Sequence, residues 1–164
     1  LWGTDNGRDW LGDDLPPEEV NVIREGEHYG WPYRYGQNRP DPKYGDRAPA
    51  TLSFVPPAFE LPAHWAPLGL GFYSGNQFPG DYRGDLFVAC HGSWNSSVRV
   101  GYKVIRITME NGLPVRFHDF VTGFLGSGAK VLGRPVDVVA GPRGALFVSD
   151  DYRGVIYRIV YPGK

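Results

Sequence analysis

Apolar residues along this chain gather in short runs, and three of these runs resemble one another. They begin at Leu1, Leu86 and Leu146, and each ends within a few positions in glycine or polar residues. A second apolar run follows each of them, at residues 20–24, 103–107 and 155–159. In the last two copies another run precedes the first, at residues 67–72 and 135–140, and a turn with Gly84 or Gly144 follows it. Short apolar runs bounded by turn residues predict β-strands.

The repeated pattern predicts antiparallel meanders. Strand, glycine turn, strand, loop and strand, repeated with irregular spacing, is typical of the blades of a β-propeller. We therefore predict an all-β partial propeller of about three blades, at residues 1–60, 61–125 and 126–164. A β-sandwich with accidentally similar strands is the alternative. Because three blades cannot close a ring and Leu1 already lies in a strand-like run, we expect an N-terminal half to be missing.

Composition and charge exclude several classes of protein. The 23 glycines and 15 prolines interrupt almost every window of a dozen residues, so long helices are not expected. The net charge is −1 and the chain has no run of Lys and Arg, so the sequence predicts no basic surface for binding nucleic acid. No apolar stretch approaches the roughly 20 residues of a membrane span. Cys90 is the single cysteine, so no intrachain disulfide can form.

The loop after the first apolar run is rich in acidic residues. Six carboxylates lie between Asp5 and Glu19, and charges at this density repel one another unless a cation, salt bridges or water separates them. The insertions at residues 7–19, 92–102 and 151–154 follow equivalent strands. We therefore expect them to meet at one rim, where propellers carry their ligands, and we expect a bound cation there.

Several motifs together resemble the quinoprotein glucose/sorbosone dehydrogenase family, and most closely its sorbosone-dehydrogenase-like branch. They are GDDLPPEEVN at residues 12–21, GEHYGWP at 26–32, LPAHWAPLG at 61–69, GDLFVACHGSWN at 84–95 and GRPVDV at 133–138. Their order is that of the C-terminal half of these enzymes. The resemblance implies a six-bladed propeller that binds pyrroloquinoline quinone (PQQ) over calcium. It also implies a soluble aldose or sorbosone dehydrogenase, periplasmic or secreted, that passes electrons to an external acceptor.

The resemblance also implies two calcium sites. The backbone carbonyls of Gly7 and Arg8 match ligands of the calcium that lies against PQQ, and calcium accepts such oxygens readily. The carboxylate of Glu19 and the carbonyl of Tyr29 match positions that hold a second, structural calcium. Asp13, Asp14 and Glu18 could supplement this second site, and a solvated acidic loop is the alternative for each of them.

Four residues match family positions that contact PQQ. Asn6 offers an amide, and closure of a turn is its alternative role. His64 lies where a side chain borders the cofactor, and Arg134 matches an arginine that pairs with PQQ carboxylates, chemistry that guanidinium groups do well. Because Val136 stands where some members have a second arginine, we expect Arg99 to supply the missing charge.

No residue of this chain matches the family's general base, a histidine oriented by a carboxylate. We expect that base in the missing half, so these 164 residues alone are not expected to be catalytic. His91 and Trp94 either line the cofactor or substrate pocket or pack within their loop. Two other functions remain open: a non-catalytic, calcium-stabilised propeller that binds glycan or protein, and a lactonase-type hydrolase, which carbonyl ligands at Gly7 and Arg8 disfavour.

Overall fold

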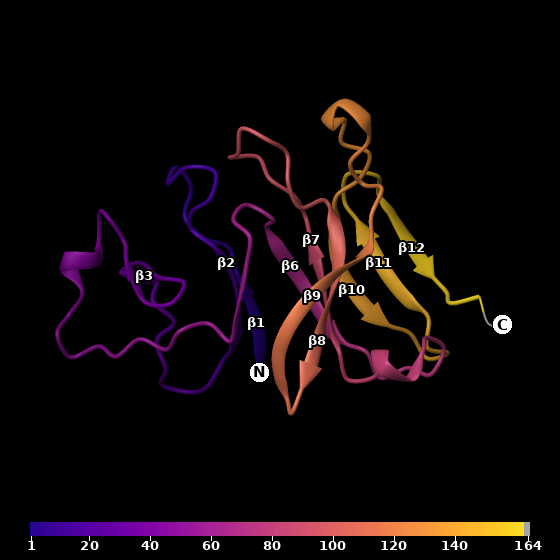
Figure 1. Cartoon of the computed structure of the whole chain (residues 1–164), viewed down its shortest axis with the longest axis horizontal. Coiled ribbons are helices and arrows are strands. Elements are labelled where there is room, and N and C mark those ends of the chain that lie inside the picture. Colours follow the sequence, from indigo (N-terminus) through magenta and orange to yellow (C-terminus); the bar gives the residue numbers. More distant parts are fainter. Residues whose placement is uncertain (163–164) are drawn as a thin grey trace.

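The computed structural model describes residues 1–162, and their regular structure is almost entirely β (Figure 1). The strands are β1 (Trp2–Asp5), β2 (Glu18–Val22), β3 (Arg34–Tyr35), β4 (Arg39–Pro40), β5 (Phe59–Leu61), β6 (Pro67–Phe72), β7 (Leu86–Cys90), β8 (Lys103–Glu110), β9 (Leu113–Val121), β10 (Pro135–Ala140), β11 (Leu146–Asp150) and β12 (Val155–Ile159). Short 3-10 turns lie at Gly45–Arg47, Gly80–Tyr82 and Ser127–Ala129. Among the described residues no helix is long and apolar enough to cross a membrane.

Three antiparallel sheets follow one another along the chain. The first has the order β1-β2-β5, the second β6-β7-β8-β9 and the third β10-β11-β12, while β3 and β4 form a separate hairpin. Within each sheet, neighbours in space are also successive strands of that sheet, as expected of a meander (Figure 1). The prediction of an all-β, partial propeller fold is confirmed.

Five strands differ from the prediction. The strand expected at residues 20–24 is β2, which begins earlier because Asp5 and Thr4 of β1 pair with Glu19 and Val20. The apolar runs also predicted none of β3, β4, β5 and β9, of which β9 is the outer strand of the second sheet. Asn111 and Gly112, both with positive φ, form the turn between β8 and β9. An Asn-Gly pair between strands is a strong hairpin signal, and it would have revealed β9.

The core lies between successive sheets. Strand β7 is buried on both faces: Val88 packs in the cluster that contains Val20 of the first sheet, and Phe87 packs in the cluster that contains Val138 of the third. This explains why β7 is a continuous apolar run rather than an alternating one. Strands with one exposed face, such as β12, keep exposed residues such as Ile156.

Tyr73 links the second and third sheets through its hydroxyl group. This buried hydroxyl donates to the Gly144 carbonyl at 2.7 Å and accepts hydrogen bonds from the backbone N–H groups of Gln77 and Phe78 at 3.0 and 3.1 Å. Tyr73→Phe is expected to lower the free energy of unfolding by about 2 kcal/mol, because it leaves buried donors unpaired. Urea denaturation measures this loss. The control is Tyr152→Phe at an exposed position; equal midpoints for the two variants would contradict the prediction.

Candidate active site

The loops that follow β1 and β7 meet at one edge of the sheets. Asn95 Nδ2 donates to Asp9 Oδ1 at 3.3 Å, and the backbone N–H of Ser97 donates to Asp13 Oδ1 at 2.9 Å. In Figure 1 these loops extend from the same end of their sheets. The expected meeting of the insertions at residues 7–19 and 92–102 is therefore confirmed.

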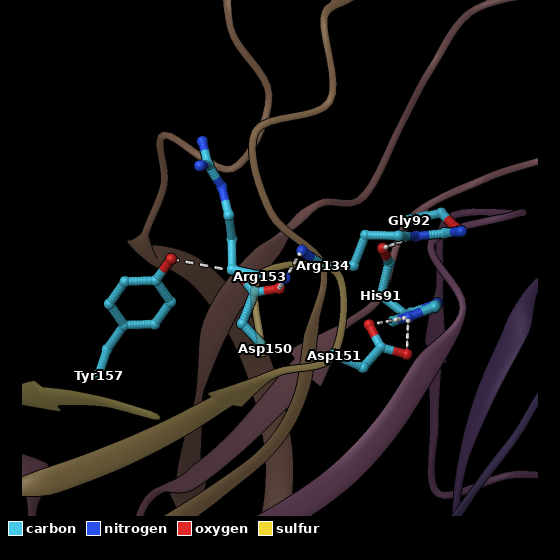
Figure 2. Close-up of polar contacts among 7 residues, drawn as sticks. All are labelled: His91, Gly92, Arg134, Asp150, Asp151, Arg153 and Tyr157. Atoms are coloured by element: carbon cyan, nitrogen blue, oxygen red, sulfur yellow. Dashed lines mark hydrogen bonds and ion pairs between the residues drawn. The ribbon is translucent and has the colours of Figure 1, made fainter. Parts of the chain in front are cut away.

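The third sheet joins this rim through a histidine and an arginine (Figure 2). His91 Nε2 lies 3.0 and 3.1 Å from the two carboxylate oxygens of Asp151, in the turn after β11, and this contact lowers the pKa of Asp151. Arg134 donates to the carbonyls of His91 and Gly92 at 3.2 and 2.7 Å. Asp150 Oδ1 in turn accepts the backbone N–H of Arg134 at 3.0 Å. All three predicted insertions thus lie at one rim.

A cleft of about 170 Å³ opens between the first two loops. It brings together Asn6 and His64, two of the predicted cofactor contacts, with Gly7, a predicted calcium ligand. Its lining comprises Asn6, Gly7, Asp9, Glu18, His64, Ala66, Gly92, Ser93, Trp94 and Asn95. The cleft therefore collects polar groups from distant parts of the sequence, as ligand sites commonly do.

Hydrogen bonds hold the side chains of Asn6 and His64 in this cleft. Asn6 Nδ2 donates to the Pro67 carbonyl at 3.2 Å, and His64 Nε2 lies 2.7 Å from the Gly12 carbonyl. Because a carbonyl only accepts, Nε2 of His64 carries the hydrogen in this contact, and Nδ1 of the neutral ring remains an acceptor. His64 has a φ of 63° and is buried, so strained backbone places this ring at the cleft.

Glu18 lines the cleft, whereas the sequence suggested it only as a supplementary ligand of the structural calcium. Its buried carboxylate accepts the backbone N–H groups of Gly7 at 2.9 Å and Ala66 at 3.1 Å. Burial raises the pKa of Glu18, although these two hydrogen bonds oppose the rise. The carboxylate thereby ties the acidic loop to the segment that leads into β6. Its alternation with Glu19 along β2 could have shown that the two side chains face opposite sides of the strand.

A second, much smaller cavity of about 20 Å³ lies behind Gly7, with space for one water or ion. Asp5 and Glu19 line it, and burial raises the pKa of both carboxyl groups. Glu19 accepts hydrogen bonds from the Gly36 N–H at 2.7 Å and from Asn21 Nδ2 at 3.0 Å. A cation in this position would stabilise the ionised carboxylates that burial disfavours.

Arg8 also lines the small cavity, but its side chain is engaged elsewhere. Its Nη1 lies 3.0 Å from both carboxylate oxygens of Asp41. Burial opposes ionisation of Asp41, but hydrogen bonds from the Lys43 and Tyr44 N–H groups and from Arg8 outweigh it, so the pKa of Asp41 is lowered. Because a guanidinium is a cation without an acceptor atom, Arg8 can offer a metal only its backbone carbonyl.

Three observations test whether these residues fit calcium. Within residues 1–162, no group of three or more His, Cys, Asp or Glu side chains could hold a metal ion. A Cβ at Gly7 would overlap Pro16 Cγ, which keeps side-chain atoms away from this backbone. Asn21 Oδ1, in the residue bonded to Glu19, is buried without a hydrogen-bond partner in the described part of the chain. Backbone carbonyls, carboxylates and an amide oxygen are the donors that calcium accepts, so the chemistry of these residues is compatible with the metal, and the calcium ligands themselves stay a prediction.

The side chain of Tyr29 lies at the end of β2 and, within the described residues, makes no hydrogen bond to Glu19. Its hydroxyl lies 2.8 Å from the Val22 carbonyl and 2.6 Å from the Glu27 carboxylate, which folds the ring against the end of β2. Tyr29 is not among the residues that line the small cavity beside Glu19. The shared structural calcium of Glu19 and Tyr29 therefore stays a prediction.

Arg99 and Arg134, the two predicted cationic contacts, converge on one aromatic ring. Arg99 Nη1 donates to the hydroxyl of Tyr102 at 3.2 Å, and Arg134 Cζ lies 5.4 Å from the centroid of the same ring. Tyr102 is buried, and its ring would overlap a Cβ at Gly92, which lines the cleft. Neither arginine lines the cleft: both guanidinium groups contact Tyr102, behind Gly92 of the cleft wall. Their contact with a cofactor stays a prediction.

Comparisons with known proteins agree with this architecture. Residues 30–162 match the model of the TrAA12-like family. An uncharacterised protein of Borreliella burgdorferi is 43% identical over 164 residues, which cover 98% of this chain and 43% of that protein.

Two solved structures share the fold of this chain. The calcium structure of the Trichoderma reesei carbohydrate-active enzyme of family AA12 superposes with a TM-score of 0.71 at 23% identity, covering 96% of this chain and 47% of that one. The holo form of the PQQ domain of pyranose dehydrogenase from Coprinopsis cinerea gives a TM-score of 0.68 at 23% identity, covering 96% and 48%.

The chain spans less than half the length of each of these proteins. The family match, however, extends from the residues just after the acidic loop and β2 to the end of the described structure. It includes the second and third sheets together with His64, Arg99 and Arg134. The family resemblance found in the sequence is confirmed: this chain belongs to the TrAA12-like family.

Proposed function

We propose that this chain is part of a PQQ- and calcium-dependent sugar dehydrogenase that oxidises a sugar hydroxyl or aldehyde and passes the electrons to an external acceptor. The observation that carries the proposal is the cleft, which gathers Asn6, Gly7 and His64 beside Glu18. Each of the first three was expected there from the sequence. The similar proteins support the same chemistry, since one is a PQQ domain and another a calcium structure. The family resemblance supports a periplasmic or secreted location.

The proposed roles follow from the groups that each residue offers. Arg134 and Arg99 would pair with carboxylates of the cofactor, while Asn6 and His64 would contact it through hydrogen bonds. The carbonyls of Gly7 and Arg8 would hold the adjacent calcium. PQQ, when bound, supplies the redox chemistry by accepting a hydride from the sugar.

The remaining metal residues have a supporting role. Glu19 and Tyr29 would hold a structural calcium that keeps the acidic loop folded around the cleft. Glu18 contributes in a different way, because its hydrogen bonds to Gly7 and Ala66 fix the backbone on two sides of the cleft. It is a positioning residue. A general base is not among the residues we assign, and we propose that the rest of the protein provides it.

The experiment that tests the proposal is reconstitution of the full-length protein with PQQ and Ca²⁺. Aldoses are then expected to support reduction of an artificial dye acceptor. Absence of PQQ binding, or absence of turnover across a panel of aldoses, would sink the proposal.

Calcium removal gives a separate prediction. Chelation with EDTA is expected to lower dye reduction at least about tenfold, since the metal polarises the cofactor. Added Ca²⁺ should restore the rate, whereas Mg²⁺ should not, because Mg²⁺ demands a compact octahedral site that backbone carbonyls of a loop do not provide. Initial rates with each metal measure the effect. Full activity in EDTA, after dialysis against chelator, would show that the carbonyls of Gly7 and Arg8 hold no essential ion.

A further inference from the structure

Two tryptophans stand exposed beside the cleft. Trp10, in the acidic loop, is 75% exposed, and Trp94, in the loop after β7, is 66% exposed. Their ring centroids are 5.6 Å apart and the rings are nearly perpendicular, at 84°. We call this pair the tryptophan platform. It packs against neither hydrophobic core cluster, so it contributes little to folding.

The backbone of Trp10 is strained as well. Trp10 has a φ of 68°, a left-handed conformation that bulky residues rarely adopt. Exposed aromatic surface and local backbone strain both oppose stability. Strain that persists in a loop beside a ligand site is an indication of function.

Polar groups surround the platform and hold it in place. Together they enclose a hollow of about 430 Å³, lined by Trp10, Gly12, Asp13, Trp94, Asn95, Ser96 and Ser97. The contacts of Asn95 with Asp9 and of Ser97 with Asp13 fasten the two loops to each other. The two loops that carry the indoles are therefore fixed relative to each other, so the protein loses less conformational entropy when a ligand binds.

This combination suits a carbohydrate better than an apolar peptide. The C–H faces of a pyranose ring pack on indole rings, and its hydroxyl groups need amide, hydroxyl and carboxylate partners close by. Asn95, Ser96 and Asp13 offer these three kinds of group within the same hollow. Apart from the two indoles, the lining has no large apolar side chain, so an apolar peptide would find few partners.

The hollow adjoins the proposed cofactor cleft, since Trp94 and Asn95 line both. We propose that the tryptophan platform binds the inner pyranose units of an oligosaccharide whose terminal unit enters the cleft. The cleft part of this inference rests on the proposed function. Binding of sugar units to the platform does not require oxidation, and can be measured without it.

The test is titration of the full-length protein with cellotetraose, maltotetraose and xylotetraose. Calorimetry and quenching of tryptophan fluorescence measure the binding. The wild type is expected to bind at least one of them more tightly than it binds the matching monosaccharide. Trp10→Ala should lower the affinity for that tetrasaccharide at least about tenfold, which is the scale of a lost aromatic anchor. Trp94→Phe, which retains an aromatic face, should lower this affinity less than Trp94→Ala does.

Phe72→Ala is the matched control. Phe72 belongs to another edge-to-face pair, with Trp2, and lies at the far end of β6 from the rim. This variant should bind the tetrasaccharide as the wild type does. Circular dichroism melting verifies that each variant is folded.

The outcomes separate the two proposals. Failure of the wild type to bind any of the three tetrasaccharides, or unchanged binding by folded Trp10→Ala and Trp94→Ala variants, overturns the platform. Slower reduction of a protein acceptor by these variants, with oligosaccharide binding unchanged, also overturns it and assigns the surface to a protein partner. Tetrasaccharide binding that depends on the platform, in a protein that oxidises no sugar, supports the platform and refutes the dehydrogenase.

Discussion

Replacing Gly69 with alanine is expected to lower the free energy of unfolding by about 3 kcal/mol or more. Gly69 lies in β6 where this strand passes β10, and a Cβ there would overlap Asp137 Oδ1 and lie 2.6 Å from Asp137 Cα. A side chain can swing away, but the Cα atom can move only with its strand. Relief of the clash therefore requires the second and third sheets to separate, which opens the core between them. Since domains of this size are only marginally stable, much of the variant should be insoluble at 37 °C.

Urea denaturation and the soluble yield measure this effect. Gly80→Ala is the control, because a Cβ at Gly80 would meet no atom within 4 Å and its φ is not in the left-handed region. The control should unfold at the midpoint of the wild type. If Gly69→Ala did so too, the sheets would be less closely packed at β6 and β10 than the structure shows.

Removing the guanidinium of Arg134 is expected to have the largest effect on cofactor binding. Arg134→Ala should weaken the binding of PQQ about 30-fold, equivalent to about 2 kcal/mol, because charge-assisted hydrogen bonds to a carboxylate are lost. The change also removes the hydrogen bonds from Arg134 to the carbonyls of His91 and Gly92, which help shape the cleft wall. Titration of the apoprotein with PQQ, followed by absorbance or activity, measures the dissociation constant.

Two companion variants make the result specific. Arg134→Lys keeps the charge but loses the forked geometry, so its affinity should fall between those of the wild type and Arg134→Ala. Arg116→Ala removes an exposed arginine of β9 and should leave PQQ binding unchanged. Wild-type affinity in a folded Arg134→Ala variant would mean that Arg134 only supports the loop after β7.

Several site residues could be predicted because the family motifs specify them. Asn6 and Gly7 were named by their position in the family pattern and His64 from the motif at residues 61–69, and the structure places all three in one cleft. Arg134 was named from the motif at residues 133–138 and Arg99 because Val136 replaces a second arginine, and the two meet at Tyr102. Such patterns specify residue types, so they predict the chemical groups of a site before any distance between them is known.

Other parts of the site had no signal in the sequence. Glu18 was one carboxylate among six in the acidic stretch, and alternation along β2 separates it from Glu19 without showing which of the two faces the cleft. Its importance comes from its contacts with the N–H groups of Gly7 and Ala66, the second of which lies 48 residues away. The pairing of His91 with Asp151 joins positions 60 residues apart. Such contacts form only after the sheets have packed.

By itself, the sequence determined the class of fold and the chemical groups at the rim. Alternation and short apolar runs act over a few residues, because a strand buries its side chains with a period of two, and glycines end strands locally. The positions of the rim loops depended on tertiary structure, because loops have no periodicity and their side chains find partners on other sheets. Packing of β1 against β6 brings Trp10 beside Trp94, and packing of β10 against β6 and β7 brings Arg134 to Tyr102, which Arg99 also contacts. A list of polar and aromatic residues thereby becomes a cleft with a defined wall.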